Sequence, residues 1–104
     1  MNRIRSRRSG VQLYTMAFEW DPKKAVSNAR KHGIRFADTV AALEDDRAVT
    51  VRDDASEEDR WVTIGMDASG QIVVVVYAWR GENIRIISAR LASRHEARHY
   101  TENL

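Results

Sequence analysis

Hydrophobic and polar residues follow a helical period in the first half of this chain. The segment 22–32 starts after Asp21, a residue type that caps helices, and has Pro22 at its first position, where the missing N–H costs nothing. Gly33 follows its last turn and can take the positive φ that ends a helix. A second helix is expected over residues 36–43, where apolar residues recur at helical spacing.

The pattern then changes to the period of strands, and the strands it predicts are 48–52, 60–66, 71–79 and 84–90. Short turns between them favour an antiparallel meander, in which the most apolar run, 71–79, is central. Ser93 and Glu96 form a capping box that begins a last helix, expected to reach about residue 102. With a short strand over 17–20, the elements predict an α+β fold. We expect an antiparallel sheet of about four to five strands, with two N-terminal helices and one C-terminal helix packed on one face.

The length of 104 residues fits one small domain. Residues 1–15 carry four arginines and no acidic residue, and they predict a separate, basic and flexible N-terminal arm. Residues 16–104 are expected to form the single folded domain. The chain has no cysteine, which excludes disulfides, thiolate chemistry and cysteine-based zinc sites. Its longest apolar run, 72–79, has only strand length and no signal peptide is evident, so we expect a cytoplasmic protein without a membrane span.

The formal net charge of +2 conceals two regions of opposite sign. Residues 38–67 carry ten acidic residues against three arginines. Residues 80–104 carry five arginines and two histidines against three acidic residues. Such a distribution suits an anionic ligand on one side and a basic partner on the other, although a mixed, solvated surface is the simpler interpretation of the charge alone.

Familiar catalytic motifs are absent from the sequence, which has no P-loop, no glycine-rich dinucleotide motif and no nucleophile elbow. His95 and His99 have the spacing of two metal ligands on one helix, but the neighbouring Arg94 and Arg98 would repel a cation. We therefore expect neither a metal site nor a cofactor.

What remains is a set of arginines on neighbouring predicted strands. Arg60 opens one strand, Arg80 closes the next, and the last is bracketed by Arg85 and Arg90. Because side chains alternate between the two faces of a strand, Arg85 and Arg90 would point to opposite faces of a regular strand. A β-bulge, or a place at the sheet edge, is needed to gather them.

Arginine suits a phosphodiester, because its planar fork donates two hydrogen bonds to phosphate oxygens and stays charged. In RNA the 2′-hydroxyl can attack the adjacent phosphorus, so the protein has only to orient that hydroxyl, stabilise the developing charge and move two protons. Glu58, Glu82 or a histidine could serve as acid or base. Each also has a simpler interpretation: a solvated loop carboxylate for Glu58, a paired turn residue for Glu82, and a helix-terminal imidazolium for His32.

Two sets of residues match a known family in order and spacing. The first set is Phe18-Glu19-Trp20-Asp21-Pro22, Lys24-Ala25, Asn28, Lys31-His32-Gly33 and Phe36. The second set is Arg60, Thr63-Ile64-Gly65, Gly70, Val74-Val75-Val76, Ile84-Arg85-Ile86-Ile87-Ser88-Ala89-Arg90, Ala92, Glu96 and Tyr100. Together they make residues 16–104 resemble the BrnT family, the toxins of type II toxin–antitoxin systems. The chain departs from that pattern at Arg35, where a serine usually caps the second helix, and in the arm 1–15.

The resemblance implies a RelE-like fold and a metal-independent ribonuclease that inhibits translation. It also implies a BrnA-like antitoxin, a ribbon-helix-helix protein that neutralises the toxin in a heterotetramer and carries the complex to operator DNA. Carried over by position, the catalytic candidates are Arg60, Arg80, Glu82, Arg85 and Arg90. The RNA-binding candidates are His32, Arg94, Arg98 and Tyr100, of which His32 and Tyr100 could instead be structural.

Two other functions stay open. A catalytically inactive relative could act as a corepressor with its antitoxin, and an acid or base within reach of the arginines would argue against that function. A regulator that binds DNA directly through residues 1–15 and 80–99 is the weaker alternative. Without its four N-terminal arginines the chain has 13 basic and 15 acidic residues, a net charge of −2, and it lacks a helix-turn-helix signature.

Overall fold

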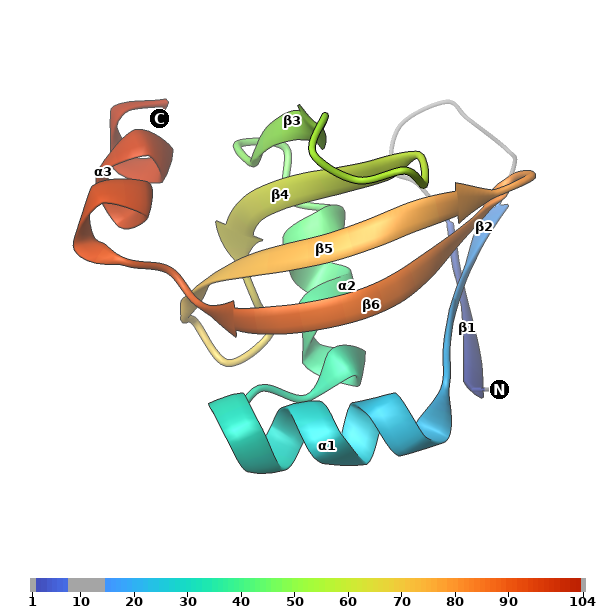
Figure 1. Cartoon of the computed structure of the whole chain (residues 1–104). Coiled ribbons are helices and arrows are strands. Elements are labelled where there is room, and N and C mark those ends of the chain that lie inside the picture. The colour runs from blue at the N-terminus through green and yellow to red at the C-terminus, as the bar shows by residue number, and fades with distance from the viewer. Residues whose placement is uncertain (1, 8–14, 104) are drawn as a thin grey trace.

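The computed structural model describes residues 2–7 and 15–103, and in them a six-stranded sheet packs against helices (Figure 1). The elements are β1 (Asn2–Arg7), β2 (Thr15–Trp20), α1 (Pro22–His32), α2 (Phe36–Leu43), β3 (Val49–Asp53), β4 (Arg60–Met66), β5 (Ile72–Arg80), β6 (Asn83–Leu91) and α3 (Arg94–Glu102). Across the sheet the order is β1-β2-β6-β5-β4-β3. The predicted α+β class is confirmed, with two N-terminal helices and one C-terminal helix.

The sheet is mixed rather than wholly antiparallel. β3 to β6 form the predicted meander, but β2 runs parallel to β6 and pairs with it through Phe18 and Glu19. β1 pairs antiparallel with β2, which satisfies backbone groups of residues 2–7 where the sequence predicts a flexible arm. Residues 1 and 8–14 lie outside the described residues, so the boundary of an arm at residue 15 stays a prediction.

Local signals explain where the helices begin and end. The carboxylate of Asp21 accepts a hydrogen bond from the Lys23 N–H at 2.8 Å, and Gly33 ends α1 with φ of 70°. α3 begins with the complete capping box between Ser93 and Glu96. α2 has no such cap: its N-cap residue, Arg35, makes no side-chain hydrogen bond to the start of the helix.

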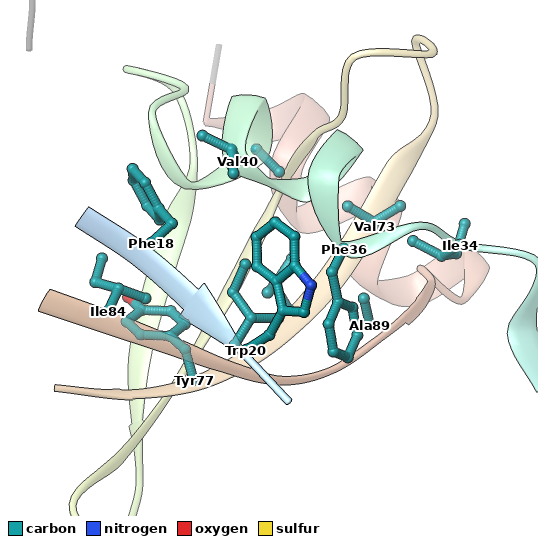
Figure 2. Close-up of a cluster of buried hydrophobic side chains, with 12 residues drawn as sticks. Phe18, Trp20, Ile34, Phe36, Val40, Val73, Tyr77, Ile84 and Ala89 are labelled. Carbon is teal, nitrogen blue, oxygen red and sulfur yellow. The ribbon is translucent and has the colours of Figure 1, made fainter. Parts of the chain in front are cut away.

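The core lies between the sheet and the first two helices, and Figure 2 shows its largest side chains. The rings of Trp20 and Phe36 meet edge to face with centroids 6.1 Å apart, which joins β2 to α2. The cluster consists of Phe18, Trp20, Ile34, Phe36, Val40, Ala42, Val73, Val75, Tyr77, Ile84, Ile86 and Ala89. This cluster determines which face of each strand points into the core. The opposite face of the sheet is therefore available for a functional site.

Gly65 lies at a close approach between α2 and the sheet. A Cβ atom at Gly65 would lie 2.6 Å from the carbonyl oxygen of Ala42, so no larger residue fits there without displacing backbone. α2 can therefore pack directly against β4, and the family resemblance at Gly65 has a steric cause.

The edge of β6 beyond the short pairing with β2 is covered by α1. The side chain of Asn28 donates to the carbonyl of Ala89 at 2.8 Å and accepts from the Ala89 N–H at 3.0 Å, as a neighbouring strand would. Its amide also donates to the carbonyl of Ile34 at 3.1 Å. Asn28 is buried, so these bonds satisfy a polar side chain that would otherwise be costly to enclose.

The third helix does not share the face covered by the first two. Figure 1 shows α1 and α2 together on one side of the sheet and α3 beyond the ends of β4 and β6. Tyr100 attaches α3 through its hydroxyl, which donates to the carboxylate of Asp45 at 2.6 Å, and Asn103 donates to the carbonyl of Arg47. The expectation that all helices lie on one face is therefore wrong for α3.

Candidate functional site

The face of the sheet opposite the α1–α2 core, here called the outer face, carries a row of charged residues. Strand register places Arg60 opposite Ala78, Ala78 opposite Arg85, and Arg85 opposite Glu19. Opposed residues of neighbouring strands point to the same face, and the inward-facing Tyr77 and Ile86 fix which face that is. The row therefore crosses four strands on the outer side.

A β-bulge gathers the arginines of β6. Val76 is opposite Ser88 while Tyr77 is opposite Ile86, so Ile87 is an extra residue without a partner on β5. Because the extra residue reverses the alternation, Arg85, Ser88 and Arg90 all belong to the outer face. This is the irregularity that the arginine spacing required, and no glycine or proline marks it in the sequence.

Glu58 joins two of the predicted arginines. Its Oε2 lies 2.9 Å from Arg60 Nη2 and accepts from Arg60 Nε at 3.0 Å, while its Oε1 lies 3.5 Å from Arg80 Nη2. The hydrogen bond and charge of Arg60, followed by the charges of Arg80 and Lys24, hold the pKa of Glu58 below its ordinary value. The carboxylate is thus an ionised base among cations, and its side chain remains 47% exposed.

Arg85 belongs to the same part of the outer face. One strand separates Arg60 from Arg85, which places their Cα atoms about 10 Å apart, within reach of two long side chains. Ala78 between them is only 4% exposed, although it lies on the outer face. We call Glu58, Arg60, Arg80 and Arg85 the arginine cluster; three of the five predicted catalytic residues are in it.

Glu82 lies in the turn between β5 and β6 and is exposed. The simpler interpretation of this residue was a pair with a neighbouring arginine. Within the described residues Glu82 makes no ion pair, and Arg80, one of its two neighbouring arginines, pairs with Glu58. The Glu82 carboxylate is therefore open to solvent, and it can reach a ligand bound at the neighbouring arginine cluster.

Arg90 has a different environment from the arginine cluster. Its two terminal nitrogens bind the two carboxylate oxygens of Glu96 at 2.7 and 2.8 Å. The same carboxylate accepts from the Ser93 N–H at 2.8 Å, so the pair joins the end of β6 to the start of α3. The hydrogen bonds from Arg90 lower the pKa of Glu96 to about 2, against the smaller opposing effect of burial. This geometry favours a structural role for Arg90.

The remaining predicted residues of α3 are also away from the arginine cluster. Tyr100 is 6% exposed and uses its hydroxyl on Asp45, so the ring is not available for stacking on a base. Arg94 and Arg98 are exposed on α3. His95 and His99 contact one another, with 3.3 Å between their Nε2 atoms, and among the described residues no three side chains of metal-ligand type gather into a site.

His32, by contrast, lies at a cleft beside the bulge. This cleft of about 180 Å³ is lined by Lys24, Ser27, Asn28, Lys31, His32, Ile87 and Ser88. We call it the α1–bulge cleft. Sequence reasoning found His32 but missed Lys24 and Lys31, which the spacing of 24, 27, 28 and 31 puts on one stripe of α1. Only the bonds of Asn28 to β6 reveal which stripe faces the sheet.

The chain resembles known proteins both in sequence and in structure. Residues 20–96 match the family described as the ribonuclease toxin, BrnT, of type II toxin–antitoxin systems. The structure is similar to the 1.1 Å crystal structure of the Brucella abortus ribonuclease toxin BrnT, with a TM-score of 0.60 and 30% sequence identity. The match covers 74% of this chain and 96% of the Brucella chain. None of the curated proteins matches the chain significantly.

Proposed function

This chain belongs to the BrnT family of ribonuclease toxins from type II toxin–antitoxin systems, and we propose that it is a metal-independent endoribonuclease that cleaves RNA and so inhibits translation. The observation that carries the proposal is the arginine cluster, in which Glu58 lies within ion-pair distance of Arg60 and Arg80. A carboxylate among guanidinium groups supplies a base and phosphate ligands on one open face.

In the proposed reaction, Arg60 and Arg85 hold the scissile phosphate and stabilise the charge that develops on its oxygens. Glu58 takes the proton of the 2′-hydroxyl, whose oxygen attacks the phosphorus and forms a cyclic phosphate. The bond to the 5′ oxygen breaks, and that oxygen takes a proton from solvent or from Glu82 in its protonated, carboxylic acid form. Arg80 orients Glu58 and adds to the positive field.

The partners follow from the same membership. A type II system pairs its toxin with a protein antitoxin, and we propose a BrnA-like ribbon-helix-helix protein that assembles with the toxin as a heterotetramer in the cytoplasm. Operator DNA is then bound through the antitoxin. No helix in the described part of the chain is long and apolar enough to cross a membrane.

The alternative of an inactive corepressor predicts arginines with no acid or base in reach. Glu58 meets two of the arginines directly, which favours the enzyme. The corepressor alternative predicts that the chain binds its antitoxin normally and leaves RNA intact.

The test is cleavage of RNA by the purified chain in the presence of a metal chelator. We expect cleavage by the wild-type chain and a loss of about 100- to 1,000-fold in kcat/KM for Arg60→Ala and for Arg85→Ala, the range seen when one donor to a transition-state oxyanion is removed. Arg52→Ala is the matched control, because Arg52 pairs with Asp59 at 3.1 Å on the edge strand β3, outside the arginine cluster. Intact RNA with folded wild-type chain, or equal rates for all three variants, would refute the proposal.

A further inference from the structure

The α1–bulge cleft has the composition of an anion site. Lys24, Lys31 and His32 contribute cationic or protonatable groups, and Ser27 and Ser88 contribute hydroxyl donors. Its volume of about 180 Å³ corresponds to roughly six water molecules at about 30 Å³ each, which is enough for a phosphate group with part of its hydration.

The lining of this cleft is held in place from behind. The carboxamide of Asn28 is hydrogen-bonded to the backbone of Ala89 and Ile34. Its side chain therefore fixes α1 against β6 and is not a ligand-binding group of the cleft. The bulge at Ile87 turns Ser88 toward the outer face, next to the α1 stripe of Lys24 and Lys31. The cleft is therefore formed by elements whose relative position is set by buried hydrogen bonds.

The cleft and the arginine cluster adjoin along β6. Arg85 in the cluster and Ser88 in the cleft belong to the same face of the same strand, with only the bulge between them. Lys24 lines the cleft, and its charge also acts on the arginine cluster, since it contributes to the low pKa of Glu58. A single polyanionic strand crossing the outer face would meet the cluster and then the cleft.

We propose that the α1–bulge cleft binds a backbone phosphate of the RNA strand next to the scissile phosphate, with Lys24 and Lys31 as its charged ligands. The inference rests on the proposed ribonuclease function and adds the path of the substrate to it. Such a contact reads no base, so it positions the strand without selecting its sequence.

The test compares three lysines of one helix. Lys24→Gln and Lys31→Gln remove charges from the cleft, whereas Lys23→Gln removes the same charge from an exposed position of α1 that does not line it. The probe is a single-stranded 2′-deoxy oligonucleotide, which lacks the attacking hydroxyl and is bound without being cleaved. We expect each cleft variant to weaken binding several-fold and to lower the slope of log affinity against log salt by about 0.7.

With cleavable RNA, Lys31→Gln should raise KM and leave kcat within about twofold, because Lys31 acts only on binding of the strand. Lys24→Gln should raise KM as well, and its kcat is not used as a criterion because the Lys24 charge also acts on Glu58. Inorganic phosphate at millimolar concentration should compete only weakly with the oligonucleotide for the cleft. Strong competition would instead indicate a site for free phosphate. Equal effects of Lys23→Gln and the two cleft variants would overturn the proposal. Weakened binding in a chain that cleaves no RNA would instead refute the ribonuclease function and retain the cleft as a strand site.

Discussion

Two arginine–glutamate groups lie at opposite ends of the outer face, and they use the same chemistry differently. At one end Glu58 is shared between Arg60 and Arg80 and remains open to solvent. At the other end Arg90 and Glu96 meet fork to fork, and Glu96 also caps α3. The first group keeps charges that a ligand can recruit, whereas the second has engaged its charges in joining two elements.

The difference shows that residue type and strand position do not assign a role to an arginine. What distinguishes Arg90 from Arg60 is that a carboxylate from α3 meets both terminal nitrogens of Arg90, whereas Arg60 shares its carboxylate, Glu58, with Arg80. Perturbing each group in turn should therefore affect activity at one end and stability at the other.

The largest effect is expected from Glu58→Gln. As the base in the proposed reaction, Glu58 should contribute about 100- to 10,000-fold to kcat. Because its pKa is held below the ordinary value of 4.5, wild-type activity should persist as pH falls and decline only below that value. Rates from pH 3.5 to 8 measure this, with Glu57→Gln as the control at the neighbouring exposed carboxylate. An unchanged rate for Glu58→Gln would move the base to Glu82 or to solvent.

Arg90→Ala should affect folding more than chemistry. Removing the arginine leaves Glu96 without its bidentate partner, and we expect the free energy of unfolding to fall by about 1–2 kcal/mol. Urea denaturation measures the loss, and the rate of RNA cleavage per folded molecule should stay within a few-fold of wild type. A hundredfold loss of cleavage at unchanged stability would return Arg90 to the arginine cluster, as the family resemblance implies.

The acid stability of the chain should depend on Glu96. Its pKa falls from 4.5 to about 2 on folding, so its stabilising contribution is complete above pH 4.5 and is lost as pH falls toward 2. With screening by solvent, we expect Glu96→Gln to lower the free energy of unfolding by about 1 kcal/mol at pH 7. Denaturation at pH 7 and pH 3 should show a smaller difference for the variant than for wild type. The same difference in both chains would contradict the assignment.

Tyr100→Phe should have the smallest effect of the four. It removes one hydrogen bond to Asp45, whose carboxylate keeps bonds from the N–H groups of Arg47 and Met66, so we expect a loss of about 1 kcal/mol or less. Affinity for a single-stranded oligonucleotide should not change, because the ring is buried. A clear loss of affinity would restore Tyr100 as a residue that contacts RNA.

Most of the fold follows from local signals in the sequence. Asp21, Pro22 and Gly33 bound α1, the Ser93 capping box begins α3, and the turns of the meander order β3 to β6. The parallel pairing of β2 with β6 could not be predicted in this way. It joins distant segments, and it depends on how α1 and α2 pack against the sheet. The place of α3 likewise depends on Tyr100 meeting Asp45, a contact between distant segments.

The sequence identifies the members of the arginine cluster as candidates but does not predict their arrangement. Arg60, Arg80 and Arg85 stand out in the sequence, and Glu58 is among the candidate bases. The bulge that puts Arg85 and Arg90 on one face is required by their spacing, but nothing in the sequence marks its position, since Ile87 is as good a strand residue as its neighbours. Lys24 and Lys31 are indistinguishable from solvated lysines until the face of α1 that meets β6 is known.

Asn28 also determines how this chain behaves beside copies of itself. A strand edge with free backbone groups invites the addition of another chain, which is the first step toward fibres and precipitates. The carboxamide of Asn28 takes up both backbone groups of Ala89, and α1 covers the edge around it. One side chain thus takes the place of a neighbouring strand at this stretch of β6 and removes one template for self-association.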